Sequence, residues 1–153
     1  MTDESSFTLR PAALDDARHL FDWRNDAETR RQSRSGAPLD WRAHLDWLHR
    51  TLADPNRRIL IGLSGGVPCG MARLDRIDET SSELSWVVAP AFRGQGLGSR
   101  LVAAALAQAK TPRILAEIKA GNPGSLAVAR RCGFRAIGET AGITRWEAYR
   151  TLS

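Results

Sequence analysis

The sequence contains few cysteines and no long hydrophobic segment, and these absences exclude several classes of protein. Its two cysteines, Cys69 and Cys132, lie far apart and in no spacing typical of a disulfide framework, a metal site or a redox motif. No apolar run reaches the roughly 20 residues that a membrane-spanning helix needs. The first residues, MTDESSF, are too polar for a signal peptide. We therefore expect a cytoplasmic protein with reduced thiols, no metal and no membrane partner.

Positive charge exceeds negative charge only mildly, with a net charge of +5, and the basic residues are scattered along the chain. The densest basic stretch is RRQSR at 30–34. A nucleic-acid-binding protein more often has a basic stripe with aromatic residues, or a recognisable reading motif. We therefore expect no nucleic-acid partner, and a surface with a mild preference for anionic ligands.

The 153 residues fit one domain, spanning 1–153, and 42% hydrophobic residues suffice for a core without disulfides. Hydrophobic periodicity and turn residues predict the order of the secondary structure. The predicted strands are 7–11, 57–63, 67–77, 83–90, 113–120, 134–139 and 144–150, and the predicted helices are 14–26, 41–54, 96–110 and 123–132. Antiparallel hairpins followed by one βαβ crossover predict an α/β fold with a mixed, mostly antiparallel sheet flanked by helices.

Two helix starts have specific capping signals. Asp40 is a plausible N-cap for the second helix, whose stripe of Trp41, Leu45, Leu48 and Leu52 is expected to face the core. His44 and His49 of that helix are expected on its surface. Asn122 can cap the last helix, with Pro123 at its first position and Gly133 at its end.

The stretch RGQGLGSR, at 93–100, has glycines at alternate positions directly before a helix. A Walker phosphate loop is excluded because the chain contains no Gly-Lys pair, and the dinucleotide fingerprint would need a glycine where Ser99 stands. A pyrophosphate cradle accounts for all three glycines, since backbone N–H groups and the helix N-terminus can surround an anion, and Arg93 adds a cation. The alternative is a glycine-rich turn that only lets strand and helix pack closely.

RGQGLG resembles the R-x-x-G-x-G motif of the GNAT superfamily of N-acetyltransferases. The element order, the proline-ended strand before the loop, and the later segment with Asn122, Ser125, Gly133 and Phe134 resemble that family too. The resemblance implies a splay between strands 83–90 and 113–120 that admits acetyl-CoA as co-substrate. The implied cofactor-binding residues are Trp86, Val87, Val88, Arg93, Gly94, Gln95, Gly96, Leu97, Gly98, Ser99, Asn122 and Ser125.

Acetyl transfer to an amine needs a base for the ammonium proton. Glu83 matches the place where many family members carry a strand glutamate, so it is the predicted catalytic base; the alternative is a surface glutamate. Many members also carry a tyrosine seven residues after the asparagine, but this chain has Ala129 there, and its single tyrosine is Tyr149. We therefore expect water to protonate the thiolate, or the thiolate to leave unassisted. A degenerate CoA-binding module without turnover is the competing hypothesis.

The acceptor is expected to be a small-molecule amine. The segments WRND, at 23–26, and HLDWL, at 44–48, resemble the branch that acetylates nucleotide-linked amino sugars, as in pseudaminic acid synthesis. The implied acceptor residues are Trp23 for stacking, with Arg24, Asn25 and Arg30. A core role for Trp23 and a peptide N-terminus as acceptor are the alternatives, and the protein is expected to be a monomer or homodimer.

Overall fold

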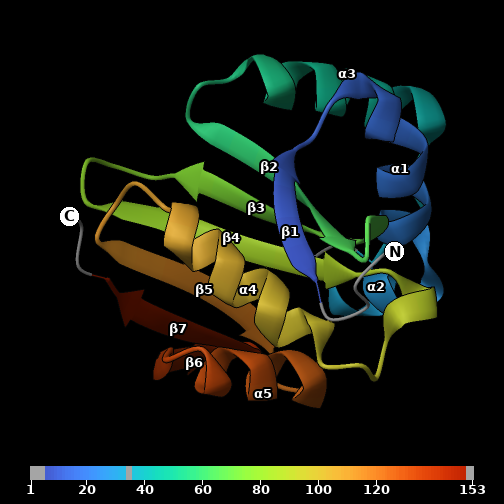
Figure 1. The fold of residues 1–153 in the computed structure, drawn as a ribbon. Helices are drawn as coiled ribbons and strands as arrows, with labels where there is room; N and C mark the ends of the chain where they lie inside the picture. Colours follow the sequence, from blue (N-terminus) through green and yellow to red (C-terminus); the bar gives the residue numbers. More distant parts are fainter. Residues whose placement is uncertain (1–5, 34–35, 151–153) are drawn as a thin grey trace.

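The computed structural model describes residues 6–33 and 36–150, and its centre is a seven-stranded sheet with the strand order β1-β2-β3-β4-β5-β7-β6 (Figure 1). In the described part of the chain all neighbouring strands are antiparallel except β4 and β5. The strands are β1 (Phe7–Pro11), β2 (Arg57–Ser64), β3 (Val67–Arg76), β4 (Ser81–Val88), β5 (Arg113–Lys119), β6 (Arg135–Thr140) and β7 (Ile143–Tyr149). The predicted fold class, a mixed and mostly antiparallel sheet, is confirmed.

The helices are η1 (Leu14–Asp16), α1 (Ala17–Asn25), α2 (Ala27–Gln32), α3 (Trp41–Ala53), η2 (Pro90–Phe92), α4 (Leu97–Gln108) and α5 (Pro123–Arg131). The predicted helix at 14–26 corresponds to η1 and α1, whereas the following helix, α2, was not predicted. Asp26 has an extended ψ of 138°, and its carboxylate accepts a hydrogen bond from the Thr29 backbone N–H at 3.1 Å. Asp26 therefore ends α1 and caps α2.

Alternate residues of the sheet enter two separate cores, one on each face. Ile59, Ile61 and Met71 pack with α1 and α3, whereas Leu60 and Leu74, on the other side of the pleat, pack with α4 and α5. Figure 1 shows α1 and α3 on one side of the sheet and α4 across the other. Because both faces are covered, β2 is buried at four consecutive positions, 59–62.

The buried stripe of α3 differs from the predicted one. Its buried residues are His44, Leu48 and Thr51, whereas Trp41 is 38% exposed. Two polar side chains can face the core because each has a backbone partner: His44 Nε2 lies 3.0 Å from the Ala17 carbonyl oxygen, and Thr51 Oγ1 donates to the Trp47 carbonyl at 2.7 Å. The surface position predicted for His44 is therefore wrong.

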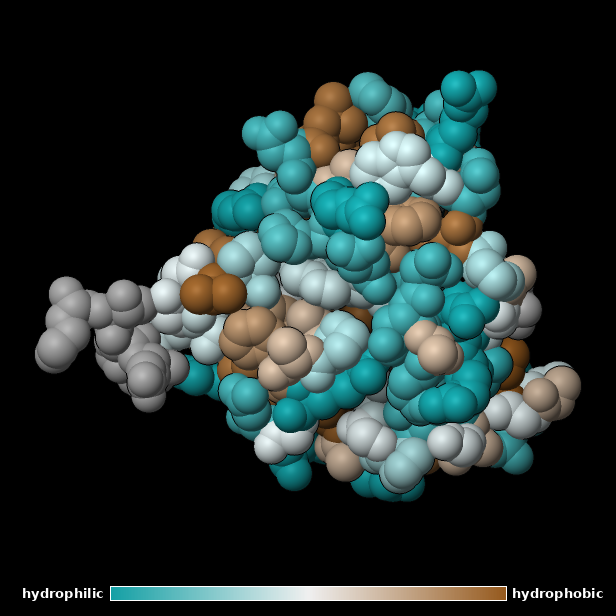
Figure 2. All heavy atoms as spheres, turned by 90° about the vertical axis from the view of Figure 1, so that its right-hand side faces the viewer, coloured by the Kyte–Doolittle hydropathy of each residue, from teal (hydrophilic) through white to brown (hydrophobic). Residues whose placement is uncertain are grey.

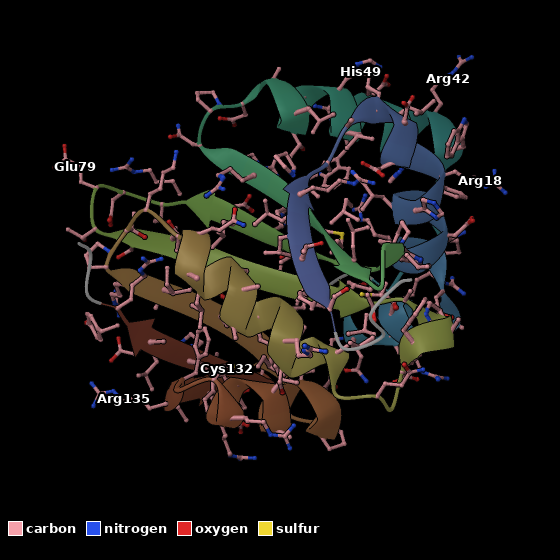
Figure 3. All side chains as sticks on the ribbon, in the orientation of Figure 1. Arg18, Arg42, His49, Glu79, Cys132 and Arg135 are labelled. Carbon is pink, nitrogen blue, oxygen red and sulfur yellow. The ribbon has the colours of Figure 1, made fainter. Side chains whose placement is uncertain are left out.

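Arg18, Arg42 and His49 lie on the outer surface of α1 and α3 and point away from the sheet (Figure 3). His49 is exposed, as predicted. In the described segments no helix is long and apolar enough to cross a membrane.

Candidate functional site

The two parallel strands at the centre of the sheet separate along their length. β4 pairs with β5 only over Ser81–Glu83 and Arg113–Leu115. β4 continues to Val88 and β5 continues to Lys119, so the carboxyl-terminal halves of the two strands are not paired with each other. The predicted splay is therefore present, and it leaves backbone groups of β4 beyond Glu83 facing a gap.

Two cavities meet at this splay. One, which we call the glycine-loop cavity, has a volume of about 660 Å³ and is lined by the glycine stretch at 94–98 and the start of α5. The other, which we call the arginine cavity, has a volume of about 470 Å³ and is lined by arginines of α1, α2 and β3. Ser85, Trp86 and Val87 of β4 line both cavities. A molecule lying along β4 can therefore reach from one cavity to the other.

The glycine loop presents backbone donors to its cavity. Gly94 and Gly96 have φ of 79° and 74°, a region that disfavours other L-residues. Gly96 is the N-cap of α4 and provides no side-chain cap, so the first N–H groups of the helix face the cavity at the positive end of its dipole. This arrangement is suited to binding phosphate.

Gly98 has a different role from the other two glycines. A Cβ at this position would lie 3.1 Å from Val128 Cγ2, so the absence of a side chain allows α4 and α5 to pack closely. The two interpretations of the glycine stretch therefore apply to different glycines: Gly94 and Gly96 precede α4 and form the anion cradle, and Gly98, in the first turn of α4, allows close packing.

Arg93 does not direct its guanidinium toward the loop N–H groups. Its Nη2 donates to Asp26 Oδ2 at 2.5 Å and to Thr29 Oγ1 at 3.2 Å, which joins the glycine loop to the start of α2. This hydrogen bond is the main reason why the pKa of Asp26 is lowered. In the unliganded protein the Arg93 side chain thus connects the glycine loop to α2, and its use as a diphosphate ligand stays a prediction.

Asn122 and Ser125 line the glycine-loop cavity from the start of α5. Asn122 Oδ1 accepts from the Ser125 N–H at 3.2 Å, which confirms the predicted N-cap. Next to them, Arg131 Nη1 donates to Ser99 Oγ at 3.3 Å. Cys132 lies where α5 faces α4 (Figure 3), and burial raises the pKa of its thiol, as expected for a packing residue rather than a nucleophile.

Two glutamates line the arginine cavity, one from each splayed strand. Glu83, the predicted base, lies at the last paired position of β4, opposite Leu115. Glu117 lies two residues further along β5 and lines both cavities. Our sequence reasoning did not select Glu117, although the alternation in RILAEIKA places it on the same strand face as Leu115 and Lys119.

The four predicted acceptor residues separate into two groups. Arg24 and Arg30 line the arginine cavity. Trp23 is only 7% exposed and packs in the core of α1 and α3 with its ring 5.5 Å from that of His19, so it has no free face for a ligand. Asn25 Oδ1 accepts from the Leu39 N–H at 2.9 Å and positions the segment before α3. Trp23 and Asn25 therefore both have structural contacts in the unliganded protein, and their roles in acceptor binding stay predictions.

Ala129, at the position where many family members carry a tyrosine, and Tyr149, the single tyrosine of the chain, both lie outside the splay. Ala129 is fully buried in the core beside α4, and Tyr149 is 66% exposed and pairs with Arg113 at the opposite end of β5. Tyr149 is therefore too far along the sheet to reach a group in the splay.

The face that carries α1 and α2 is mostly hydrophilic, with only scattered hydrophobic residues (Figure 2).

Comparison with known proteins identifies the fold. Residues 6–135 match the family model described as acetyltransferase (GNAT) domain. The chain belongs to this family. GNAT domains are acetyltransferase domains by that description, and the splayed strands and glycine loop lie inside the matched residues.

The GNAT chain is similar to several acetyltransferases, and the names of these relatives refer to different acceptors. N-alpha-acetyltransferase RimI of Mycobacterium tuberculosis is 32% identical over 94 residues, which cover 59% of this chain and only 60% of the relative. A spermidine N-acetyltransferase from Vibrio cholerae, solved with CoA and spermine, has a TM-score of 0.83 at 18% identity, covering 94% of this chain and 95% of that one. A ribosomal-protein-alanine N-acetyltransferase from Brucella melitensis has a TM-score of 0.77 at 26% identity, covering 94% and 99%. None of these three is an amino-sugar enzyme, so the predicted branch gains no support from them.

Proposed function

We propose that this protein transfers an acetyl group from acetyl-CoA to a primary amine. The observation that carries the proposal is the meeting of two cavities at Ser85–Val87, where β4 has separated from β5. One cavity has the backbone donors that a diphosphate needs, and the other has carboxylates that an amine needs. Membership of the GNAT family and the CoA bound in the Vibrio cholerae enzyme support this assignment.

The CoA diphosphate is proposed to lie on the backbone from Arg93 to Ser99, with the first turn of α4 beneath it. Its pantetheine arm would pair with the free backbone edge at Trp86–Val88. Asn122 and Ser125 would contact the arm from α5. Arg93 contributes its backbone to this site and its side chain to Asp26.

The reaction balances with groups that line the splay. The amine nitrogen forms a bond to the acetyl carbonyl carbon, the carbon–sulfur bond breaks, and the ammonium proton passes to a carboxylate, directly or through water. Glu83 is the base predicted from the sequence, and Glu117 is a second candidate because it lines both cavities. The nitrogen loses a second proton as the amide forms, and this proton goes to water or, through water, to the thiolate. A thiol with a pKa near ~8.5 is a fair leaving group, so the thiolate can leave without a protein acid.

Glutamine variants distinguish the two carboxylates. Glu83→Gln or Glu117→Gln should lower the rate at neutral pH by ~10²-fold or more if that residue is the base. The loss should shrink at high pH, where the amine arrives already neutral. The variant that keeps the wild-type rate at neutral pH identifies the glutamate with a structural role only.

One assay can test both the acetyltransferase activity and the class of the acceptor. The nucleotide-linked amino sugar is the class predicted from WRND and HLDWL, and a peptide N-terminus is favoured by the name of the Mycobacterium tuberculosis relative. Thiol release from acetyl-CoA should be measured with a nucleotide amino sugar, the free amino sugar, a short peptide and spermidine. Release above the hydrolysis rate with at least one amine supports the proposal. CoA binding without release by any amine supports the degenerate binding module instead.

A further inference from the structure

The guanidinium of Arg24 is held in one position by two neighbours on α3. Its carbon lies 3.9 Å from the centroid of the Trp47 ring, and Nη1 lies 3.1 Å from His44 Nδ1. His44 is 2% exposed, and its Nε2 lies 3.0 Å from the Ala17 carbonyl oxygen. Because a carbonyl can only accept, Nε2 carries the proton and Nδ1 accepts from Arg24. The arginine is thus oriented by a stacking contact and a hydrogen bond at once.

This cation has no carboxylate partner among residues 6–33 and 36–150. The neighbouring Arg57 and Arg73 both use Asp75, at 3.4 Å and 2.9 Å. Burial, with repulsion from Arg73 and Arg57, lowers the pKa of Arg24 to about 10, so it is still charged at neutral pH. A partly buried charge without a counter-ion is unfavourable, and a bound anionic ligand would remove that cost.

A second, independent observation comes from α2. The Nε of Arg30 is buried and has no hydrogen-bond partner within the described chain. Arg30 and Arg24 come from different helices and line the same arginine cavity. A buried donor without a partner is unusual in a native protein, and a movement of the Arg30 side chain toward a ligand oxygen in this cavity would satisfy it.

We propose that the acceptor carries an anionic group, a carboxylate or a phosphate, that Arg24 and Arg30 bind in the arginine cavity. This inference rests on the proposed function, because it places the amine of the same acceptor between Glu83 and Glu117 at the splay. Arg24 and Arg30 are then specificity-determining residues, and His44 and Trp47 are positioning residues for Arg24. A polyamine, which carries only positive charge, is a poor acceptor for this cavity, in contrast to the Vibrio cholerae enzyme named for spermidine.

Matched acceptors test the anionic group directly. The pairs are glucosamine 6-phosphate with glucosamine, a nucleotide amino sugar with the free amino sugar, and an acidic peptide with its amidated form. For the correct class, the member with the anion should have a KM lower by roughly 10- to 100-fold, the range of a charge-assisted hydrogen-bonded pair. Phosphate and carboxylate are distinguished by which pair shows the difference.

Arginine variants connect this preference to the structure. In Arg24→Ala and Arg30→Ala the preference should shrink to within about threefold, while kcat at saturation changes little. Arg24→Lys should restore only part of it, because lysine lacks the planar fork. His44→Gln should weaken the preference without abolishing it. Arg42→Ala is the control, since Arg42 points away from the sheet on the outer surface of α3 (Figure 3) and should behave as wild type.

A measurement without turnover separates this inference from the proposed function. Titration with inorganic phosphate, followed by NMR shifts of the arginine side chains, should show saturable binding that Arg24→Ala and Arg30→Ala each weaken and Arg42→Ala does not. If no amine is acetylated but this binding is seen, the activity is wrong and the anion site stands. The inference is overturned if phosphate shifts neither arginine, if both members of every pair react equally well, or if spermidine is the best acceptor.

Discussion

Replacing Arg93 tests whether the first residue of the glycine loop binds cofactor phosphates or holds α2. A charge-assisted hydrogen bond contributes about 1.5–3 kcal/mol, and an exposed ion pair contributes about 0–1 kcal/mol. The Arg93 and Asp26 side chains are 39% and 23% exposed and 2.5 Å apart, between these two cases. We therefore expect a coupling free energy of about 1 kcal/mol between them, or roughly fivefold in an equilibrium constant.

A double-mutant cycle measures this coupling. Arg93→Ala, Asp26→Asn and the double variant are compared for CoA affinity by calorimetry and for acceptor KM. Asparagine caps a helix about as well as aspartate, so α2 remains in place in the second variant. Each single variant should raise the acceptor KM by about three- to fivefold, the double variant no further, and CoA affinity should stay within about twofold.

The control is the exposed pair Arg18 and Asp22 on α1, with side chains 73% and 55% exposed, for which we expect no measurable coupling. The reasoning is refuted if Arg93→Ala weakens CoA binding tenfold or more while Asp26→Asn has no effect. That result would mean that the guanidinium leaves Asp26 and contacts the cofactor.

Three further perturbations follow from local geometry. Gly96→Val places a side chain at a φ of 74°, where strain costs about 1–2 kcal/mol. The variant should lose CoA binding in calorimetry, while its circular dichroism spectrum should still be that of a folded protein. An unchanged CoA affinity would contradict the proposed role of the glycine loop. Gly70→Ala puts a Cβ 2.5 Å from the Val87 carbonyl oxygen and should lower the free energy of unfolding by about 1–3 kcal/mol. In the control, Gly62→Ala, the new Cβ meets only side-chain atoms of Leu101 and Phe7, at 3.0 Å, so the loss should be smaller. Equal losses in thermal melts would argue against a rigid β3–β4 contact. Burial lowers the pKa of His44, so between pH ~6.5 and that lower pKa the unfolded chain binds a proton that the folded chain does not, and the free energy of unfolding decreases as the pH is lowered through this window. Urea unfolding at about pH 7.5 and about pH 5.5 should show this loss in wild type and not in His44→Gln, and a loss of equal size in both would exclude His44 as its source.

Local patterns in the sequence were sufficient to predict the seven strands of the sheet, the α-helices other than α2, and several of their ends. Asp40 accepts from the Ala43 N–H at 3.0 Å, as its capping assignment requires, and Asn122 caps α5 in the same way. The two faces of β4 also follow from the period of two in a strand, with Leu84 in the core and Glu83 lining a cavity. These features could be predicted because each depends on residues only one to four positions apart, whose spacing determines both the hydrogen bond and the face.

The partners of the site side chains were decided by tertiary structure alone. Arg93 bonds with Asp26, 67 positions away in the chain, and His44 bonds with Ala17, 27 positions away. No local pattern distinguishes Trp23, which enters the core, from Arg24, which turns toward a cavity one residue later. The sequence alone thus determined the order of the strands and of the α-helices other than α2, together with the caps at Asp40 and Asn122 and the position of the glycine loop. Only the packing of α1 and α2 against the splayed sheet decided which arginines and glutamates face one another, because those contacts depend on the path of the chain between distant elements.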